Sequence, residues 1–203
     1  MRIVVFYATR EGHTRRVAEH IASDLRALGH EVEIYDVKAV AESIDWPPYD
    51  WACVAASVHA GHHEPEVIAF VKRHRQALER LQAAFLSVTL SEAGAEDVGA
   101  TKERRARSAA EVQQMIDVFV QETGWRPARV LPVAGALAYS RYNFLIRFVM
   151  KRIARKAGAP TDISRDYEFT NWPTLDAFVR EGALAAGGTE AGSPITRSAS
   201  SDR

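Results

Sequence analysis

Apolar positions along this chain follow two different periods, and their succession predicts an alternation of strands and helices. Short runs rich in Val, Ile and Ala are typical of strands buried in a sheet, whereas apolar residues three or four positions apart indicate amphipathic helices. The predicted strands are Arg2–Tyr7, Glu31–Asp36, Trp51–Ser57, Ala84–Thr89 and Arg129–Leu137. The predicted helices lie between or after these strands and cover residues 14–28, 64–79, 108–124 and 172–184. This order predicts an α/β fold, a doubly wound sheet of five parallel strands with helices on both faces.

One polar stretch interrupts the alternation after the fourth strand. Residues 91–107 contain glycine and many polar side chains, so we interpret them as a long loop that is either mobile or a cover for a ligand. The next helix is then predicted to begin at the capping-box pattern Ser108–Glu111 and to end at Gly124.

A second interruption follows the fifth strand. An insertion at about 138–168 separates that strand from the last helix, and only the short piece 166–170 has an extended pattern. Residues 187–203 are rich in Gly, Ser and Thr, which predicts a disordered tail. The chain is therefore expected to form one domain over 1–186 with a tail.

The first strand ends in a short polar loop that is typical of a phosphate site. The apolar run from Ile3 to Tyr7 is followed by the hydroxyls of Thr9 and Thr14 around Gly12, at the start of a helix whose N–H groups point outward. The loop has neither the Walker Gly-Lys-Ser/Thr ending nor the three glycines of the dinucleotide fingerprint. One terminal phosphate of a mononucleotide fits it best; the alternative is an ordinary turn with Thr14 as helix cap.

The third and fourth predicted strands also end in polar residues. In a parallel α/β sheet, ligands bind beyond the carboxyl ends of the strands, so the three loops are expected to meet in one site. His59, His62 and His63 follow the third strand and offer a metal site as an alternative. No carboxylate or cysteine completes an obvious ligand set, and we expect no metal.

Composition and charge narrow the class of protein. The chain has 203 residues, is 47% hydrophobic and carries a single cysteine, Cys53, which lies in an apolar run and is expected in the core. The longest apolar stretch, Val130–Ala138, is far shorter than the ~20 residues that span a bilayer. Net charge is zero, but basic residues gather in 102–107 and 139–156 and leave the remainder acidic.

Residues 139–157 read as a basic amphipathic helix. Its cations stand beside an apolar stripe, and no acid occurs between residues 139 and 156. Such a helix either lies on an anionic membrane, binds an acidic ligand, or packs on the body with its charges solvated. The absence of acids favours the first two.

Six motifs in register carry a resemblance to a known family. The motifs are Phe-Tyr-Ala-Thr-Arg-Glu-Gly (6–12), Ala-Ser-Val-His-Ala-Gly-His (56–62), Ser-Val-Thr-Leu (87–90), Trp-Arg-Pro (125–127), Ala-Gly-Ala-Leu-Ala-Tyr-Ser-Arg-Tyr (134–142) and Phe-Thr-Asn-Trp (169–172). Together they resemble the menaquinone-dependent protoporphyrinogen oxidases of bacterial haem synthesis, flavodoxin-like proteins with strand order 2-1-3-4-5 and a long insertion near strand five. The similarity runs from residue 1 to about 185.

The resemblance implies FMN as cofactor. It implies a phosphate site on the first loop and a flavin ring between the other two loops, with no catalytic acid or base because the flavin carries the chemistry. The implied FMN-binding residues are Thr9, Arg10, Glu11, Gly12, His13 and Thr14 for the phosphate and Ser57, Val58, His59, Ala60, Gly61, His62, Ser87, Val88, Thr89, Leu90 and Ser91 for the ring.

One residue departs from the flavodoxin pattern. Glu11 stands where flavodoxins often have Thr, and a carboxylate beside a phosphate costs affinity unless it turns outward. We expect only the backbone N–H of Glu11 to bind, with Arg10 offsetting its charge.

The resemblance also implies the substrates. Protoporphyrinogen IX would give electrons to FMN, and a membrane quinone, either menaquinone or ubiquinone, would receive them. We therefore expect a cytoplasmic protein, peripheral on the inner face of the cell membrane, with no nucleic-acid partner; the sequence leaves a homo-oligomer open. Cations expected to contact propionates or lipid phosphates are Arg141, Arg147, Lys151 and Arg152.

Other function classes remain open at this point. A flavodoxin-type electron carrier shares the loops, although the basic insertion argues against docking through an acidic face. An FMN-dependent NAD(P)H:quinone reductase would need a nicotinamide site, and no second dinucleotide motif is present. A binding protein without redox function is the third alternative.

Overall fold

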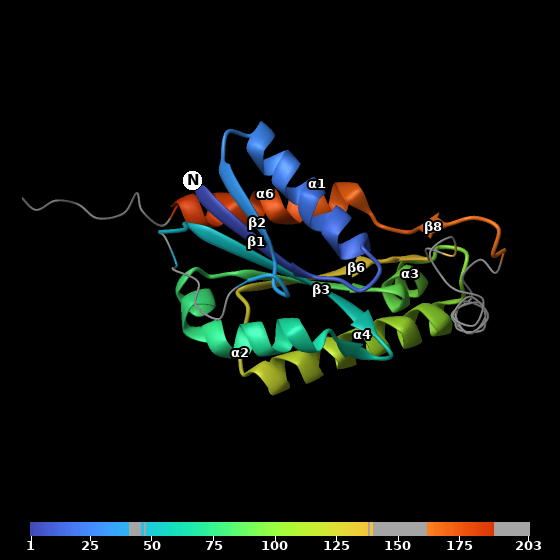
Figure 1. Cartoon of the computed structure of the whole chain (residues 1–203). Helices are drawn as coiled ribbons and strands as arrows, with labels where there is room; N and C mark the ends of the chain where they lie inside the picture. The colour runs from blue at the N-terminus through green and yellow to red at the C-terminus, as the bar shows by residue number, and fades with distance from the viewer. Residues whose placement is uncertain (41–45, 47, 138, 140–161, 189–203) are drawn as a thin grey trace, which may run out of the picture.

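The computed structural model describes residues 1–40, 46, 48–137, 139 and 162–188. They form three layers, with a twisted sheet between two pairs of helices (Figure 1). This confirms the predicted α/β fold class.

The sheet is parallel and has the predicted order. Its central path is β2-β1-β3-β5-β6, and all neighbouring strands on it run parallel. β5 and β6 are the fourth and fifth parallel strands, so the path matches the predicted 2-1-3-4-5. The short β4 is an addition that pairs antiparallel with the end of β3. The strands are β1 (Arg2–Ala8), β2 (Glu31–Asp36), β3 (Trp51–His59), β4 (His62–His63), β5 (Ala84–Thr89) and β6 (Arg129–Ala134).

Helices cover both faces of the sheet. α1 and α6 lie on one face and α2 and α4 on the other, while the short α3 stands at the end of the sheet where β5 finishes (Figure 1). The helices are α1 (His13–Ala27), α2 (Pro65–Arg80), α3 (Leu90–Glu96), α4 (Lys102–Thr123) and α6 (Trp172–Gly188).

Alternation along β1 supplies two hydrophobic cores. Ile3 and Val5 face α1 and α6, whereas Val4 and Phe6 face α2 and α4, and all four side chains are fully buried. Each contributes roughly 1.5–3 kcal/mol by leaving water. Cys53 is buried in the first core as expected, and burial raises the pKa of its thiol to about 12. The central strands are therefore held rigidly, and their carboxyl ends form a fixed edge.

The predicted loop over 91–107 is wrong. α3 begins directly after β5, and α4 begins at Lys102, where the Oγ1 of Thr101 accepts a hydrogen bond from the N–H of Arg104 (3.3 Å). Ser108 consequently lies inside α4 and does not cap it. The Arg- and Ala-rich first turns form helix readily but are solvent-exposed, so they carry no apolar stripe to reveal them. The end of α4 at Gly124 is confirmed.

The fifth predicted strand is also too long. β6 ends at Ala134, and β7 (Ala136–Leu137) leaves the sheet to pair antiparallel with β8 (Tyr167–Glu168). Gly135 lies between the two strands, and its N–H donates to the carbonyl of Thr89 (3.0 Å). Leu137 and Tyr139 form a third small core beside Leu90, Ile163, Tyr167 and Phe169.

Two predicted segments fall wholly or mainly outside the described residues. Of the basic helix predicted over 139–157, only Tyr139 is described, and it is buried. α6 continues through Gly188, so 187 and 188 are helical, and the remaining predicted tail lies outside the described part.

Candidate functional site

The loop after β1 presents free N–H groups at the start of α1. Gly12 is the N-cap residue with φ 89°, a left-handed conformation that glycine adopts without strain, and its N–H donates to the Oγ1 of Thr9 (2.9 Å). The first intrahelical bond runs from the N–H of Arg16 to the carbonyl of Gly12 (3.2 Å). The N–H groups of residues 13–15 therefore have no acceptor within the helix and form an anion site.

Thr14 tests whether a phosphate fits this loop. Its side chain is fully buried, and its Oγ1 has no hydrogen-bond partner among the described residues. A buried hydroxyl without a partner costs about 1–3 kcal/mol, whereas a phosphate oxygen would accept its proton. The residues of the loop thus fit a terminal phosphate, and the alternative of a plain turn leaves the hydroxyl unexplained.

Arg10 pairs with a buried carboxylate near the end of β3, and its expected offset of the Glu11 charge stays a prediction. Its guanidinium Nη2 donates to the Oε2 of Glu64 (2.9 Å), a carboxylate with no exposed surface, and the Oγ of Ser57 lies 3.3 Å from the other oxygen of Glu64. This contact joins the loop after β1 to the end of β3. Nothing in the sequence singled out Glu64, which was predicted only as the first residue of the helix over 64–79.

The end of β3 turns back as a two-residue hairpin. Ala60 (φ 50°) and Gly61 (φ 84°) both have positive φ, as a type I′ turn requires, and His59 pairs with His62 across it. These four residues are exposed. Four of the predicted ring-binding residues of this loop therefore stand at the outer edge of the site, whereas Ser57 and Val58 before them are half-buried.

His63 points away from the other two histidines. It is buried, its Nε2 lies 2.9 Å from the Oγ of Ser87, and its ring contacts Phe85 and Phe119. Burial, followed by the charge of His62, lowers the pKa of His63 to about 4. In the described part of the chain, no group of three or more His, Cys, Asp or Glu side chains is arranged to hold a metal ion.

The five site residues predicted at the end of β5 differ in how deeply they are buried. Ser87 is fully buried against His63, and Val88 belongs to the core beneath α1 and α6. Thr89 accepts the N–H of Ser91 (3.2 Å) and so caps α3, while Leu90 and Ser91 are half-buried at the sheet edge. Thr89 is itself buried, so only Leu90 and Ser91 have side chains that a ligand could reach.

Glu92, in the first turn of α3, follows these residues directly. Burial and the charge of Glu96 raise the pKa of its carboxyl to about 7. Sequence reasoning gave Glu92 no role, because its burial depends on tertiary structure. Its carboxyl therefore holds a proton at higher pH than an exposed glutamate does.

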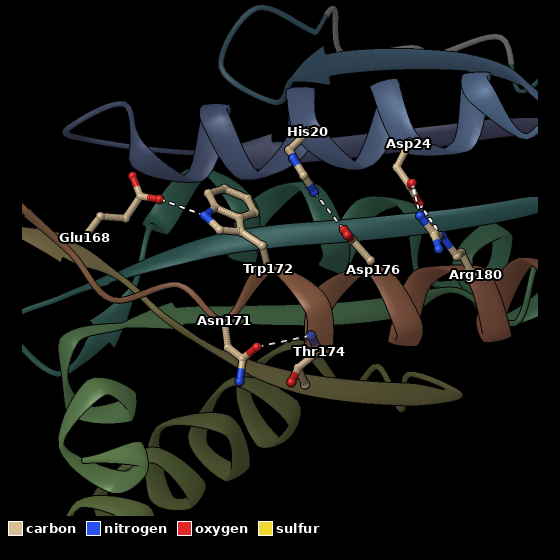
Figure 2. Close-up of polar contacts among 8 residues, drawn as sticks. All are labelled: His20, Asp24, Glu168, Asn171, Trp172, Thr174, Asp176 and Arg180. Atoms are coloured by element: carbon tan, nitrogen blue, oxygen red, sulfur yellow. Dashed lines mark hydrogen bonds and ion pairs between the residues drawn. The ribbon is translucent and has the colours of Figure 1, made fainter. Parts of the chain in front are cut away.

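The return from the insertion closes the remaining side of the site. The Nε2 of His13 lies 2.8 Å from the Oγ1 of Thr170, which follows β8, and Glu168 pairs with Arg16 (2.7 Å). Figure 2 shows how the contact continues along α1 and α6, where His20 meets Asp176 and Asp24 meets Arg180. Trp172 donates its indole N–H to Glu168 (2.8 Å).

The structure thus brings the three predicted loops together. Arg10 links the first loop to the second through Glu64, and His63 links the second to the strand that carries the third. The predicted cations lie outside the described residues: Arg141, Arg147, Lys151 and Arg152. Among the helices that are described, none is both long and apolar enough to cross a membrane.

Comparison with known proteins agrees with this geometry. A flavodoxin domain model matches residues 4–164. The chain is 32% identical over 181 residues to a protein of Escherichia coli (strain K12) named protoporphyrinogen IX dehydrogenase (quinone). The matched region covers 89% of this chain and 94% of that protein. A protein of the same name from Leishmania major is 28% identical over 184 residues, covering 89% and 74%.

A solved structure supports the fold independently. The rubredoxin oxygen:oxidoreductase from the anaerobe Desulfovibrio gigas matches with a TM-score of 0.55 and 13% identity, over 94% of this chain and 37% of that one. Identity this low shows a shared fold and nothing about chemistry.

Proposed function

This chain belongs to the flavodoxin domain family, and from that premise we propose that it binds FMN, oxidises protoporphyrinogen IX to protoporphyrin IX and passes the electrons to a quinone. The 32% identity to the Escherichia coli protein of that name extends over nearly the whole of both chains and supports the reaction. The observation in the structure that carries the cofactor is the unpartnered, buried hydroxyl of Thr14 beside the free N–H groups of α1.

The protein's own residues hold and surround the cofactor. Thr9 fixes the loop through Gly12, and Thr14 with the first N–H groups of α1 would bind the phosphate. Exposed residues of the β3–β4 hairpin and half-buried Leu90 and Ser91 would flank the ring. When bound, FMN supplies two-electron oxidation chemistry.

Glu92 would accept a proton that porphyrinogen oxidation releases. Glu92 follows Ser91 directly in the chain, in the first turn of α3, and its raised pKa of about 7 suits it to take up a proton near neutral pH.

We propose the type of quinone and the association with a membrane from the sequence. The basic segment 139–156 contains no acid and suits anionic lipid headgroups or the propionates of the substrate, through Arg141, Arg147, Lys151 and Arg152. We infer a peripheral protein on the inner face of the cell membrane, acting in haem synthesis, with menaquinone or ubiquinone as acceptor. Size-exclusion chromatography of the purified protein will determine whether it forms a homo-oligomer.

Reconstitution and a paired turnover assay test this function. Purified protein loaded with FMN is mixed with protoporphyrinogen IX and a menaquinone analogue, and in parallel with NADPH and the same analogue. We expect porphyrin fluorescence well above the control without enzyme, and slow NADPH oxidation. No porphyrin with rapid NADPH oxidation would make the chain a quinone reductase, and a protein that takes up no FMN would contradict the proposal altogether.

A further inference from the structure

Glu64 is a buried carboxylate for which the proposed function gives no role. The residue is 1% exposed, and its side chain is completely buried. It stands at the N-terminus of α2, where its carbonyl accepts the N–H groups of Val67 and Ile68. Its carboxylate, however, makes no capping hydrogen bond to the helix. The backbone of Glu64 therefore accepts hydrogen bonds from the first turn of α2, whereas its carboxylate has no part in capping the helix.

The carboxylate joins two loops that are distant in sequence. One oxygen accepts from the guanidinium of Arg10 at 2.9 Å, and the other lies 3.3 Å from the hydroxyl of Ser57. The Ser57 hydroxyl is also 3.4 Å from the carbonyl of Ala8, the last residue of β1. Glu64 thus connects the loop after β1 with the residue at which β3 begins to leave the sheet.

Burial makes this connection specific. A buried carboxylate is tolerated only when its oxygens are paired, and removing one partner leaves an uncompensated charge. Arg10 is half-exposed and would otherwise sample many rotamers, so the pair fixes its long side chain in one place. A fixed Arg10 in turn fixes the conformation of residues 9–12, which hold the free N–H groups in position.

We propose that Glu64 is a positioning residue for FMN, which holds the phosphate loop and the β3–β4 hairpin at a set spacing through Arg10 and Ser57. This inference rests on the proposed function, which places the phosphate on the first loop and the ring beside the second. A ligand that bridges two loops binds more tightly when their spacing is preorganised. Arg10 accordingly acts on FMN binding through its contact with Glu64, because the Glu64 carboxylate already neutralises the charge of its guanidinium.

A double-mutant cycle on FMN affinity tests the proposal. Glu64→Gln, Arg10→Gln and the double variant are purified as apoprotein, and the Kd for FMN is measured by quenching of flavin fluorescence. Each single variant is expected to raise the Kd at least tenfold, and the double variant by no more than threefold beyond either single variant, because one contact is lost in all three. Arg10→Lys keeps an ion pair with Glu64 and should stay within threefold of wild type.

A matched control separates positioning from general destabilisation. Arg129→Gln breaks an ion pair of 2.7 Å with Glu181 at the opposite end of the sheet, and its FMN Kd should equal that of wild type. The melting temperature of each apoprotein is measured alongside. Should Glu64→Gln not fold, Arg10→Gln decides, since it breaks the same contact from the exposed side.

The outcomes are distinct. Wild-type Kd values in folded Glu64→Gln and Arg10→Gln, with only their melting temperatures lowered, would make Glu64 a purely structural residue and overturn the inference. Independent, multiplying effects of the two changes would overturn it as well. If wild-type protein binds no FMN, the proposed function itself fails; if it binds FMN and the variants bind equally well, only this inference fails.

Discussion

The imidazole of His13 and the hydroxyl of Thr170 are joined across 157 positions of sequence by a contact of 2.8 Å between Nε2 and Oγ1. Thr170 donates its proton to the carbonyl of Ala134 (2.7 Å), so its oxygen accepts the Nε2–H of His13. Burial, opposed by Glu168, lowers the pKa of His13 and favours the neutral ring. The start of α1 is therefore fixed to the chain that returns from the insertion.

The first prediction concerns the unpartnered hydroxyl of Thr14. Thr14→Val keeps the shape of the side chain and removes only the hydroxyl, so the apoprotein should be as stable as wild type or more stable. FMN affinity should fall about tenfold, equivalent to ~1.4 kcal/mol, because a charge-assisted hydrogen bond to phosphate is lost. Flavin fluorescence titration and thermal melts measure the two effects.

Thr123→Val is the matched control for that change. Thr123 is also buried, but its hydroxyl donates to the carbonyl of Phe119 (2.7 Å). Its loss should lower stability by ~1 kcal/mol and leave FMN affinity unchanged. A Thr14→Val variant that binds FMN like wild type would argue against phosphate at this loop.

The second prediction is a pH dependence set by His63. Its pKa is about 4 in the folded protein and about 6.5 when unfolded, so between these values the unfolded state binds more protons. Stability should consequently fall as the pH is lowered from 6.5 towards 4, by ~2 kcal/mol at pH 5 from this group. His63→Gln can keep a hydrogen bond to Ser87 without titrating. Urea unfolding at pH 7 and pH 5 should show a smaller loss for the variant, and equal losses would exclude His63 as the cause.

The third prediction compares two glycines with equal space. A Cβ on Gly61 or on Gly188 would meet nothing within 4 Å, but only Gly61 has a positive φ, of 84°. Gly61→Ala should destabilise the protein by ~1 kcal/mol through backbone strain alone. Gly188→Ala should be neutral or slightly stabilising. If both variants unfold at the wild-type urea midpoint, strain in the hairpin is negligible.

The fourth prediction concerns the basic segment outside the described residues. Replacing Arg141, Arg147, Lys151 and Arg152 together with Gln should remove binding to vesicles that contain anionic lipid, at ~1 kcal/mol per charge. Zwitterionic vesicles provide the control, since neither protein should bind them strongly. Co-sedimentation measures the binding. Unchanged sedimentation together with unchanged porphyrin turnover would remove both proposed roles of these cations.

The sequence was sufficient for those elements whose pattern comes from burial. β2 and β5 have the predicted bounds, because strict alternation in one and a continuous apolar run in the other reflect how each strand is covered. The start of α4 was missed, since its first turns are exposed and lack an apolar stripe. The stop of β6 was missed because Ala136 and Leu137 pair with β8, which is distant in sequence and follows the insertion.

The site divides in a similar way. Thr9, Gly12 and Thr14 lie together between β1 and the first turn of α1 as predicted, while phosphate binding by them stays a prediction. Glu64 could not be found from sequence, since its partner Arg10 is 54 positions away and only burial distinguishes it from a surface residue. The raised pKa of Glu92 likewise arises from tertiary burial.

Anaerobic oxidation of protoporphyrinogen IX tests the central claim most directly. FMN-loaded protein is given the substrate under argon, with and without a menaquinone analogue, and porphyrin fluorescence is followed with time. The account predicts sustained porphyrin formation only when the quinone is present, with its reduction in step. Formation that is independent of quinone, or no formation above the enzyme-free control with both substrates present, would contradict it.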